Sequence, residues 1–186
     1  MRMLLACLLV SCCFASGCFV SGCFASAQAQ TASPAGSSLA ASPAAQRAQL
    51  LHRGVNASMW FAQAPDYSPA RLRSYTTTGD IALMRSMGFD HVRLSIDGDE
   101  LLRGASPNGL NATFVAELDT AVNTMLKNDL RVILDLHPSD AFKRQLRSED
   151  AAVTRFCALW SALASHYAQT DPDRVFFEVL NEPEFD

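Results

Sequence analysis

The stretch FDHVRLSI, residues 89–96, alternates between apolar and polar side chains in the way of a half-buried β-strand. Its apolar residues fall on one side of an extended chain and its polar residues fall on the other. The two sets are Val92, Leu94 and Ile96, and His91, Arg93 and Ser95. The alternation predicts a strand with one apolar and one polar side.

The segments that follow this strand repeat a helix–strand pattern. Residues 111–129, NATFVAELDTAVNTMLKND, predict a helix with Asn111 as N-cap and an apolar stripe. LRVILDLH, residues 130–137, predicts a buried strand, and residues 148–169 predict a second helix with Ser148 as N-cap. The stripes are Phe114, Leu118, Ala121, Val122 and Met125, and Val153, Phe156, Cys157, Trp160, Leu163, Ala164 and Tyr167.

The segments at the two ends extend the same pattern. GDIALMRSMG, residues 79–88, predicts a short helix that ends at a left-handed Gly88. LHRGVN, residues 51–56, predicts a strand that ends at Asn56, and VFFEVL, residues 175–180, predicts another. Four strands about 40 residues apart with helical crossovers indicate parallel neighbours and right-handed units.

Two architectures fit these crossovers, an open doubly wound sheet and a closed eight-stranded barrel. The open sheet usually carries a glycine-rich phosphate loop after its first strand. Here residues 57–79 are long, aromatic and without Gly-x-Gly. The α/β fold that we predict is therefore the N-terminal half of a (β/α)8 barrel.

Polar side chains follow every predicted strand, and in such barrels the chemistry lies at the carboxyl ends of the strands. These rim residues are Asn56, Arg93, Asp135, His137, Asn181 and Glu182. A partly desolvated glutamic acid at a rim can stay protonated near neutral pH, give its proton to a leaving oxygen and later take one from water. Glu182 is therefore the candidate acid/base, and Asn181 beside it can hydrogen-bond a substrate hydroxyl.

The four segments LHRGVN, HVRLSI, VILDLH and FFEVLNEPE, in this order, resemble the N-terminal half of glycoside hydrolase family 5, the cellulase and mannanase family. The resemblance covers about residues 50–186. It implies that Glu182 is the acid/base, that Asn181 contacts the sugar 2-hydroxyl and that Arg93 supports the nucleophile electrostatically. It also implies that His137 binds sugar and that Asn56 shapes the site.

Several of these residues have structural alternatives. Trp60 and Phe61 can stack on sugar rings or pack under the first long loop, and the sequence favours neither. Arg93 can instead be a structural partner of Glu178, for which we expect a buried structural role. Glu182 can be a helix-capping acid, and His137 can be a rim histidine without a substrate. Many family members have His-His where this chain has His137-Pro138, so the substrate stays open.

The resemblance implies a retaining glycosidase acting on a β-linked polysaccharide, a β-1,4-glucan such as cellulose or a mannan. Such enzymes need two carboxylates about 5 Å apart. The resemblance puts the nucleophilic Glu after a seventh strand, which this sequence lacks. We therefore expect the catalytic domain, residues 50–186, to be truncated after its fourth strand and inactive alone. The alternatives are a non-catalytic carbohydrate-binding half-barrel and a β-glycosidase of the same clan that acts on short sugars.

The first 49 residues predict an export signal and a linker rather than part of the folded domain. Residues 1–29 have one Arg, an apolar stretch and Ala-x-Ala patterns, as in an export signal. VSGC at Val20–Cys23 and LVSC at Leu9–Cys12 resemble lipoboxes, so lipid anchoring at Cys23 is an alternative to secretion or periplasmic release. Residues 30–49 are rich in Ala, Ser and Pro and predict a flexible linker.

Bulk composition excludes several classes. The 186 residues are 49% apolar with a formal net charge of −4, which indicates a globular domain and gives no electrostatic case for nucleic acid. No run after the leader reaches the roughly 18 apolar residues of a membrane span. Strand 1 lacks the His-x-His of metal-dependent barrel hydrolases, so we predict no catalytic metal and no cofactor. We expect a monomer.

Overall fold

The computed structural model describes residues 42–104 and 109–183. The predicted export signal, its candidate lipidation site Cys23 and most of the predicted linker lie outside these residues. The end of that linker is helical, because Pro43–Ala48 forms α1. A proline at the first position followed by alanines favours a helical turn there. Of the helices described, none is long and apolar enough to cross a bilayer.

The centre of the fold is one parallel sheet with the strand order β1-β2-β3-β4. Its strands are β1 Gly54–Phe61, β2 His91–Ile96, β3 Arg131–Leu136 and β4 Val175–Glu178. The predicted parallel order and the alternation of β2 are confirmed, since Val92, Leu94 and Ile96 are at most 1% exposed.

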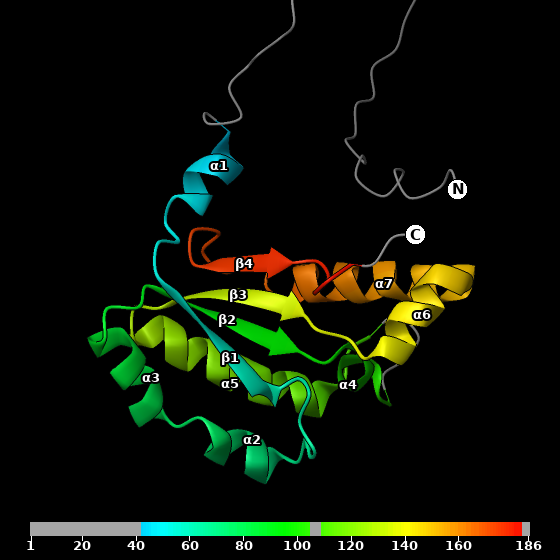
Figure 1. Cartoon of the computed structure of the whole chain (residues 1–186), viewed down its shortest axis with the longest axis horizontal. Helices are drawn as coiled ribbons and strands as arrows, with labels where there is room; N and C mark the ends of the chain where they lie inside the picture. The colour runs from blue at the N-terminus through cyan, green and yellow to red at the C-terminus, as the bar shows by residue number, and fades with distance from the viewer. Residues whose placement is uncertain (1–41, 105–108, 184–186) are drawn as a thin grey trace, which may run out of the picture. The chain divides into compact units, whose positions relative to one another are not determined.

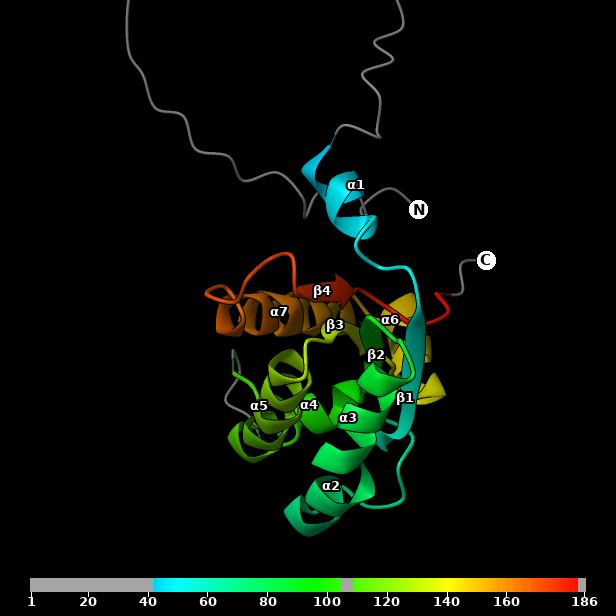
Figure 2. The same cartoon turned by 90° about the vertical axis from the view of Figure 1, so that its left-hand side faces the viewer.

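Two helices lie in each connection between neighbouring strands (Figure 1). They are α2 Pro69–Tyr75 and α3 Thr78–Ser86, α4 Gly98–Leu102 and α5 Ala112–Lys127, and α6 Asp140–Ser148 and α7 Asp150–His166. Figure 2 shows α2, α3, α5 and α7 on one side of the sheet. A doubly wound sheet has helices on both faces, so this arrangement is that of a barrel segment.

The core fills the space between the sheet and these helices. The apolar stripe predicted for α5 is confirmed, since its members are at most 5% exposed and Asn111 caps the helix by accepting from the Phe114 N–H. The apolar sides of the strands face the same core, with Val92, Leu94, Val132 and Leu134 fully buried. The opposite side of the sheet is left for polar side chains.

The structure corrects the predicted start of the last helix. Ser148 is the final residue of α6, and α7 begins after Glu149, which makes no side-chain capping bond. Ser139 is the residue that caps a helix here, by accepting from the Phe142 N–H. The α7 stripe is also shifted, because Ala152 and Leu159 are buried while Ala164 is exposed.

The first strand is longer than predicted. It continues past Asn56 to Phe61, with a register shift against β2 between Ala57 and Phe61. Met59 within this irregularity has a φ of 60°, the left-handed region that is uncommon for a side chain of its size. The irregular backbone breaks the two-residue alternation, which is why the sequence pattern did not reveal the strand's second half.

The starts of β1 and β2 are joined by Asp90. Its carboxylate accepts from the backbone N–H groups of His52 and Arg53 and contacts Nδ1 of His91 at 2.5 Å. A Cβ placed on Gly54 would lie 2.1 Å from Nε2 of His91. The histidine ring therefore occupies the space that any larger residue at position 54 needs.

We expect Gly54→Ala to lower the free energy of unfolding by about 1–3 kcal/mol, since overpacking forces the His91 ring away from Asp90. Chemical denaturation monitored by circular dichroism measures the change. Gly79→Ala is the matched control, because the nearest atom to its new Cβ lies 3.5 Å away and the position is helical. Equal stabilities for the Gly54 and Gly79 variants would contradict the steric argument.

Candidate active site

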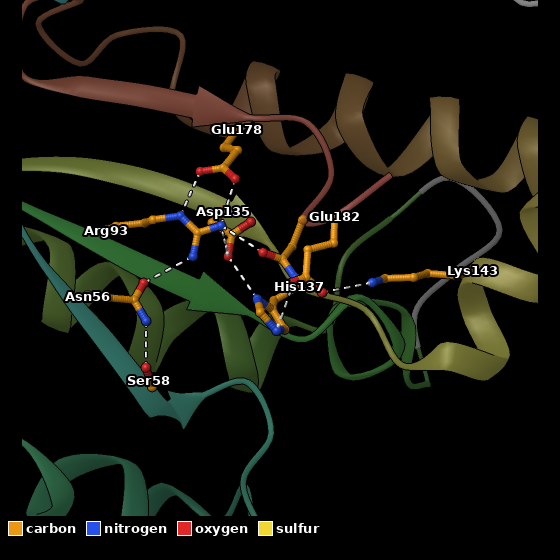
Figure 3. Close-up of polar contacts among 9 residues, drawn as sticks. Asn56, Ser58, Arg93, Asp135, His137, Lys143, Glu178 and Glu182 are labelled. Carbon is orange, nitrogen blue, oxygen red and sulfur yellow. Dashed lines mark hydrogen bonds and ion pairs between the residues drawn. The ribbon is translucent and has the colours of Figure 1, made fainter. Parts of the chain in front are cut away.

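The guanidinium of Arg93 is the centre of a polar cluster on the uncovered side of the sheet (Figure 3). It donates two bonds to Glu178, from Nε to Oε2 at 2.7 Å and from Nη2 to Oε1 at 2.6 Å. Nη2 also donates to Oδ1 of Asn181 at 3.0 Å, and Nη1 donates to Oδ1 of Asn56 at 3.1 Å. Asp135 lies 3.0 Å from Nη2.

Strand register explains why these side chains meet. Asn56 pairs with Arg93 across β1 and β2, and Asp135 pairs with Glu178 across β3 and β4. In parallel strands, residues in register point to the same face of the sheet, and side chains two apart share that face. The side of β2 that carries Arg93 is therefore continuous with the sides that carry its partners.

Asp135 is the most buried member of the cluster, with a fully enclosed side chain. Burial raises the pKa of its carboxyl above the usual value, and the hydrogen bond with His137 and the charge of Arg93 offset only part of this. Its Oδ2 lies 3.1 Å from Nδ1 of His137 and so orients that ring. Asp135 thus links the arginine to the histidine.

Glu178 is held as the ionised partner of Arg93. The bidentate hydrogen bonds from the guanidinium lower the pKa of Glu178, and the same bonds raise the pKa of Arg93. The predicted structural pairing of these two residues is therefore present. The Glu178 side chain is 37% exposed, however, so the expectation of a buried role is wrong.

Asn181 has its amide orientation set by its neighbours. Arg93 is only a donor, so the atom that faces it is the amide oxygen, and Nδ2 then faces Nε2 of His137 at 3.4 Å. Since Nδ2 is only a donor, Nε2 accepts, and Nδ1 of His137 carries the proton directed at Asp135. Asn181 is 7% exposed, and its backbone N–H donates to the Leu136 carbonyl at 2.8 Å.

Glu182 follows Asn181 in the sequence, but its side chain lies outside the Arg93 cluster and faces solvent. Its φ is 45°, a left-handed conformation that is uncommon outside glycine and is often found at functional sites. Its side chain is 81% exposed, so the partial desolvation expected at the rim is not present among the described residues. Its Oε2 lies 3.8 Å from Nζ of Lys143 on α6. An exposed carboxyl beside a fixed amide can transfer a proton to a bound substrate.

The structure brings together the predicted rim residues and leaves Trp60, the candidate for stacking on sugar, apart from them. Asn56, Arg93, His137, Asn181 and Glu182 lie at the rim. Trp60 is 3% exposed, and its indole N–H donates to the Leu72 carbonyl, so it adopts the packing alternative rather than presenting a ring face to sugar.

Sequence reasoning gave no role to Lys143, which lies on a helix that it did not predict. It named Asp135 at the rim without a role, and only the contacts supply one. Within the described ranges, no three His, Cys, Asp or Glu side chains gather as a metal site.

Comparisons with known proteins show the family and the fold to which the chain is similar. A sequence model described as "Cellulase (glycosyl hydrolase family 5)" matches residues 50–186. "Cellodextrinase A" of Ruminococcus flavefaciens is 31% identical over 140 residues, which are 70% of this chain and 40% of that protein. The solved structure of Thermotoga maritima Cel5A with cellobiose is 26% identical with a TM-score of 0.62, covering 74% of this chain and 42% of that one.

Cel5A has also been solved with mannotriose, and that structure gives a TM-score of 0.60 at 26% identity, covering 74% of this chain and 42% of that one. The chain spans about 40% of the length of the curated relatives that it matches first. The four strands described here thus correspond to part of the longer barrels.

Because the Arg93 bonds lower the pKa of Glu178, its ionised form stabilises the fold above the ordinary glutamate pKa of about 4.3. That contribution is lost as the pH falls through the lower pKa of the folded state. We expect Glu178→Gln to cost about 0.5–1 kcal/mol at pH 7, a small value because the pair is partly exposed.

Denaturant unfolding at a series of pH values measures this difference, which should shrink as the pH falls below the ordinary glutamate pKa of about 4.3. Glu149→Gln serves as the control, since that glutamate is exposed and makes no side-chain capping bond. A difference that stays constant from pH 7 to pH 3 would show that the ionisation of Glu178 is not the cause.

Proposed function

The chain belongs to the cellulase family, glycosyl hydrolase family 5, and from this we propose that the whole protein hydrolyses O-glycosidic bonds in a β-linked polysaccharide. The proposed substrate class is a β-1,4-glucan such as cellulose, or a mannan. The relatives named cellodextrinase and endoglucanase, and the cellobiose and mannotriose complexes of a related structure, support this class. The observation that carries the proposal is the exposed Glu182 carboxyl beside an Asn181 held by the Arg93 cluster.

Glu182 is the proposed acid/base. In the first step its proton passes to the glycosidic oxygen as the bond to the anomeric carbon breaks. The exposure of its carboxyl lets a bound polysaccharide reach it, and the bound sugar would itself exclude water from the carboxyl. In the second step Glu182 takes a proton from the water that attacks the anomeric carbon.

Asn181 is the proposed contact to the sugar 2-hydroxyl. Its Nδ2 carries two protons and directs one at His137, which leaves the second for a substrate hydroxyl. Bonds to Arg93 and His137 hold the amide in one orientation before substrate binds. Such a bond strengthens as charge develops on the sugar, which is where it lowers the barrier.

The retaining mechanism needs a second carboxylate as nucleophile, about 5 Å from the acid/base. By family resemblance this is a Glu that follows a seventh strand, whereas the described residues hold four strands. Arg93, His137 and Asn56 line the face on which that carboxylate would lie. The always-charged guanidinium would favour its ionised, nucleophilic form.

We further propose that the protein is exported. The leader at residues 1–29 carries this proposal, and the lipobox that ends at Cys23 is the feature that would anchor the protein to the cell envelope instead of releasing it. Either route would place the site where insoluble or polymeric glycans occur.

We expect Glu182→Gln to lower kcat/KM of the full-length protein on barley β-glucan and on glucomannan by at least about 100-fold, since general acid catalysis is lost. Release of reducing ends measures the rate. Formation of the glycosyl-enzyme from 2,4-dinitrophenyl β-cellobioside should be reduced far less, because that leaving group needs little protonation.

The control is Glu149→Gln, the same substitution on an exposed helix boundary, which should leave the rates unchanged. Normal activity of Glu182→Gln on both polysaccharides would refute the proposal. Glycan binding without hydrolysis by the unaltered full-length protein, undiminished in the Glu182 variant, would instead favour a carbohydrate-binding module.

A further inference from the structure

We propose that Lys143 is the positioning residue of the acid/base, and that its ammonium group holds the Glu182 carboxyl at the α6 side of the rim. This inference rests on the proposed function of Glu182. The positive charge also stabilises the carboxylate that remains after the proton has passed to the leaving oxygen.

The two members of this pair differ sharply in burial. The Lys143 side chain is 11% exposed, whereas that of Glu182 is 81% exposed, and Nζ lies 3.8 Å from Oε2. A lysine whose hydrocarbon stem is packed has lost its rotamer freedom before the ion pair forms. The lysine is therefore the fixed partner, and it orients a carboxyl that faces solvent (Figure 3).

The helix that carries Lys143 is itself held in place. Ser139 caps α6 by accepting from the Phe142 N–H at 3.2 Å and donates to Asp99 of α4 at 2.9 Å. Phe142 is 7% exposed and packs edge-on against Phe156 of α7, with ring centroids 6.5 Å apart.

The fit of α6 against α4 is close. A Cβ on Gly98 would lie 3.4 Å from the Phe142 ring, which is van der Waals contact, so the first turns of the two helices pack against each other. Lys143 follows Phe142 directly, and its backbone position is therefore determined by this packing.

The other charged groups near Glu182 already have partners. Arg93 adds a favourable charge from β2, but its N–H groups are directed at Glu178, Asp135 and two asparagines. His137 at the end of β3 is bonded to Asp135. Over the described residues, the ion pair that Glu182 makes is the one with Lys143.

This placement matters in both steps of the reaction. When the glycosidic C–O bond breaks, the leaving oxygen takes the Glu182 proton and a carboxylate remains beside the ammonium. When water attacks the anomeric carbon, its oxygen bonds to that carbon, its proton passes to the carboxylate, and the enzyme nucleophile leaves as a carboxylate. An opposite charge within about 4–6 Å favours the ionised form in each case.

The test compares Lys143→Met, Lys143→Arg and Lys127→Met in the full-length protein. Methionine keeps the length of the stem and removes the charge, and arginine restores the charge. Lys127 is the matched control, since it is exposed at the end of α5 that leads into the start of β3, away from the rim. The readouts are kcat and KM, measured separately on uncharged barley β-glucan, and the melting temperature.

For Lys143→Met we expect kcat to fall about two- to five-fold while KM stays within about two-fold, because the carboxyl is no longer held at the α6 side of the rim but the sugar contacts are kept. Lys143→Arg should restore kcat, and Lys127→Met should match the unaltered protein.

The outcomes separate this inference from the proposed function. An inactive Glu182→Gln variant together with an unchanged kcat in Lys143→Met would overturn the role of Lys143 alone. Loss of activity in Lys143→Met with a lowered melting temperature and no recovery in Lys143→Arg would show a packing role and also overturn it. A fully active Glu182→Gln variant would overturn the proposed function whatever Lys143 does.

Discussion

The partly buried arginine on β2 makes the interactions on which the rest of the site depends. Arg93 contacts a side chain from each of the other three strands and one from the segment after β4. A guanidinium has donors in a fixed plane, so its partners must come to it in a set geometry. Removing one carboxylate would leave part of this charge without compensation in a partly buried setting, where unpaired charge is costly.

The Arg93 cluster holds some side chains of the rim in place and leaves Glu182 outside it. Asn181 and His137 are locked by the cluster, each with a hydrogen-bonded orientation that no longer depends on substrate. Glu182 is the next residue along the chain, yet a left-handed backbone turns it outward, where its contact is with a helix rather than a strand. A rigid polar surface thus adjoins a carboxyl that is open to solvent.

The position of the helices explains why this surface is available. Residues of α2, α3, α4, α5 and α7 pack on the apolar side of the sheet, and these helices leave its polar side uncovered (Figure 2). The two-residue alternation of the strands predicted which side of the sheet is apolar and which is polar, because this alternation follows burial directly. It did not predict α2, α4 or α6, which are short helices whose formation depends on caps such as Ser68 and Ser139 more than on an apolar stripe. It also missed the second half of β1, where an irregular backbone interrupts the alternation.

The sequence by itself determined the parallel α/β order, the rim position of Asn56, Arg93, His137, Asn181 and Glu182, and the resemblance to the cellulase family, because periodicity and strand-end motifs are local properties. Only the tertiary structure decided that Trp60 belongs to the core, that Glu178 stays partly exposed and that Lys143 reaches Glu182. Burial and ion pairing depend on what other segments place nearby. Lys143 and Glu182 are separated by an entire helix and strand, and no local pattern encodes their contact.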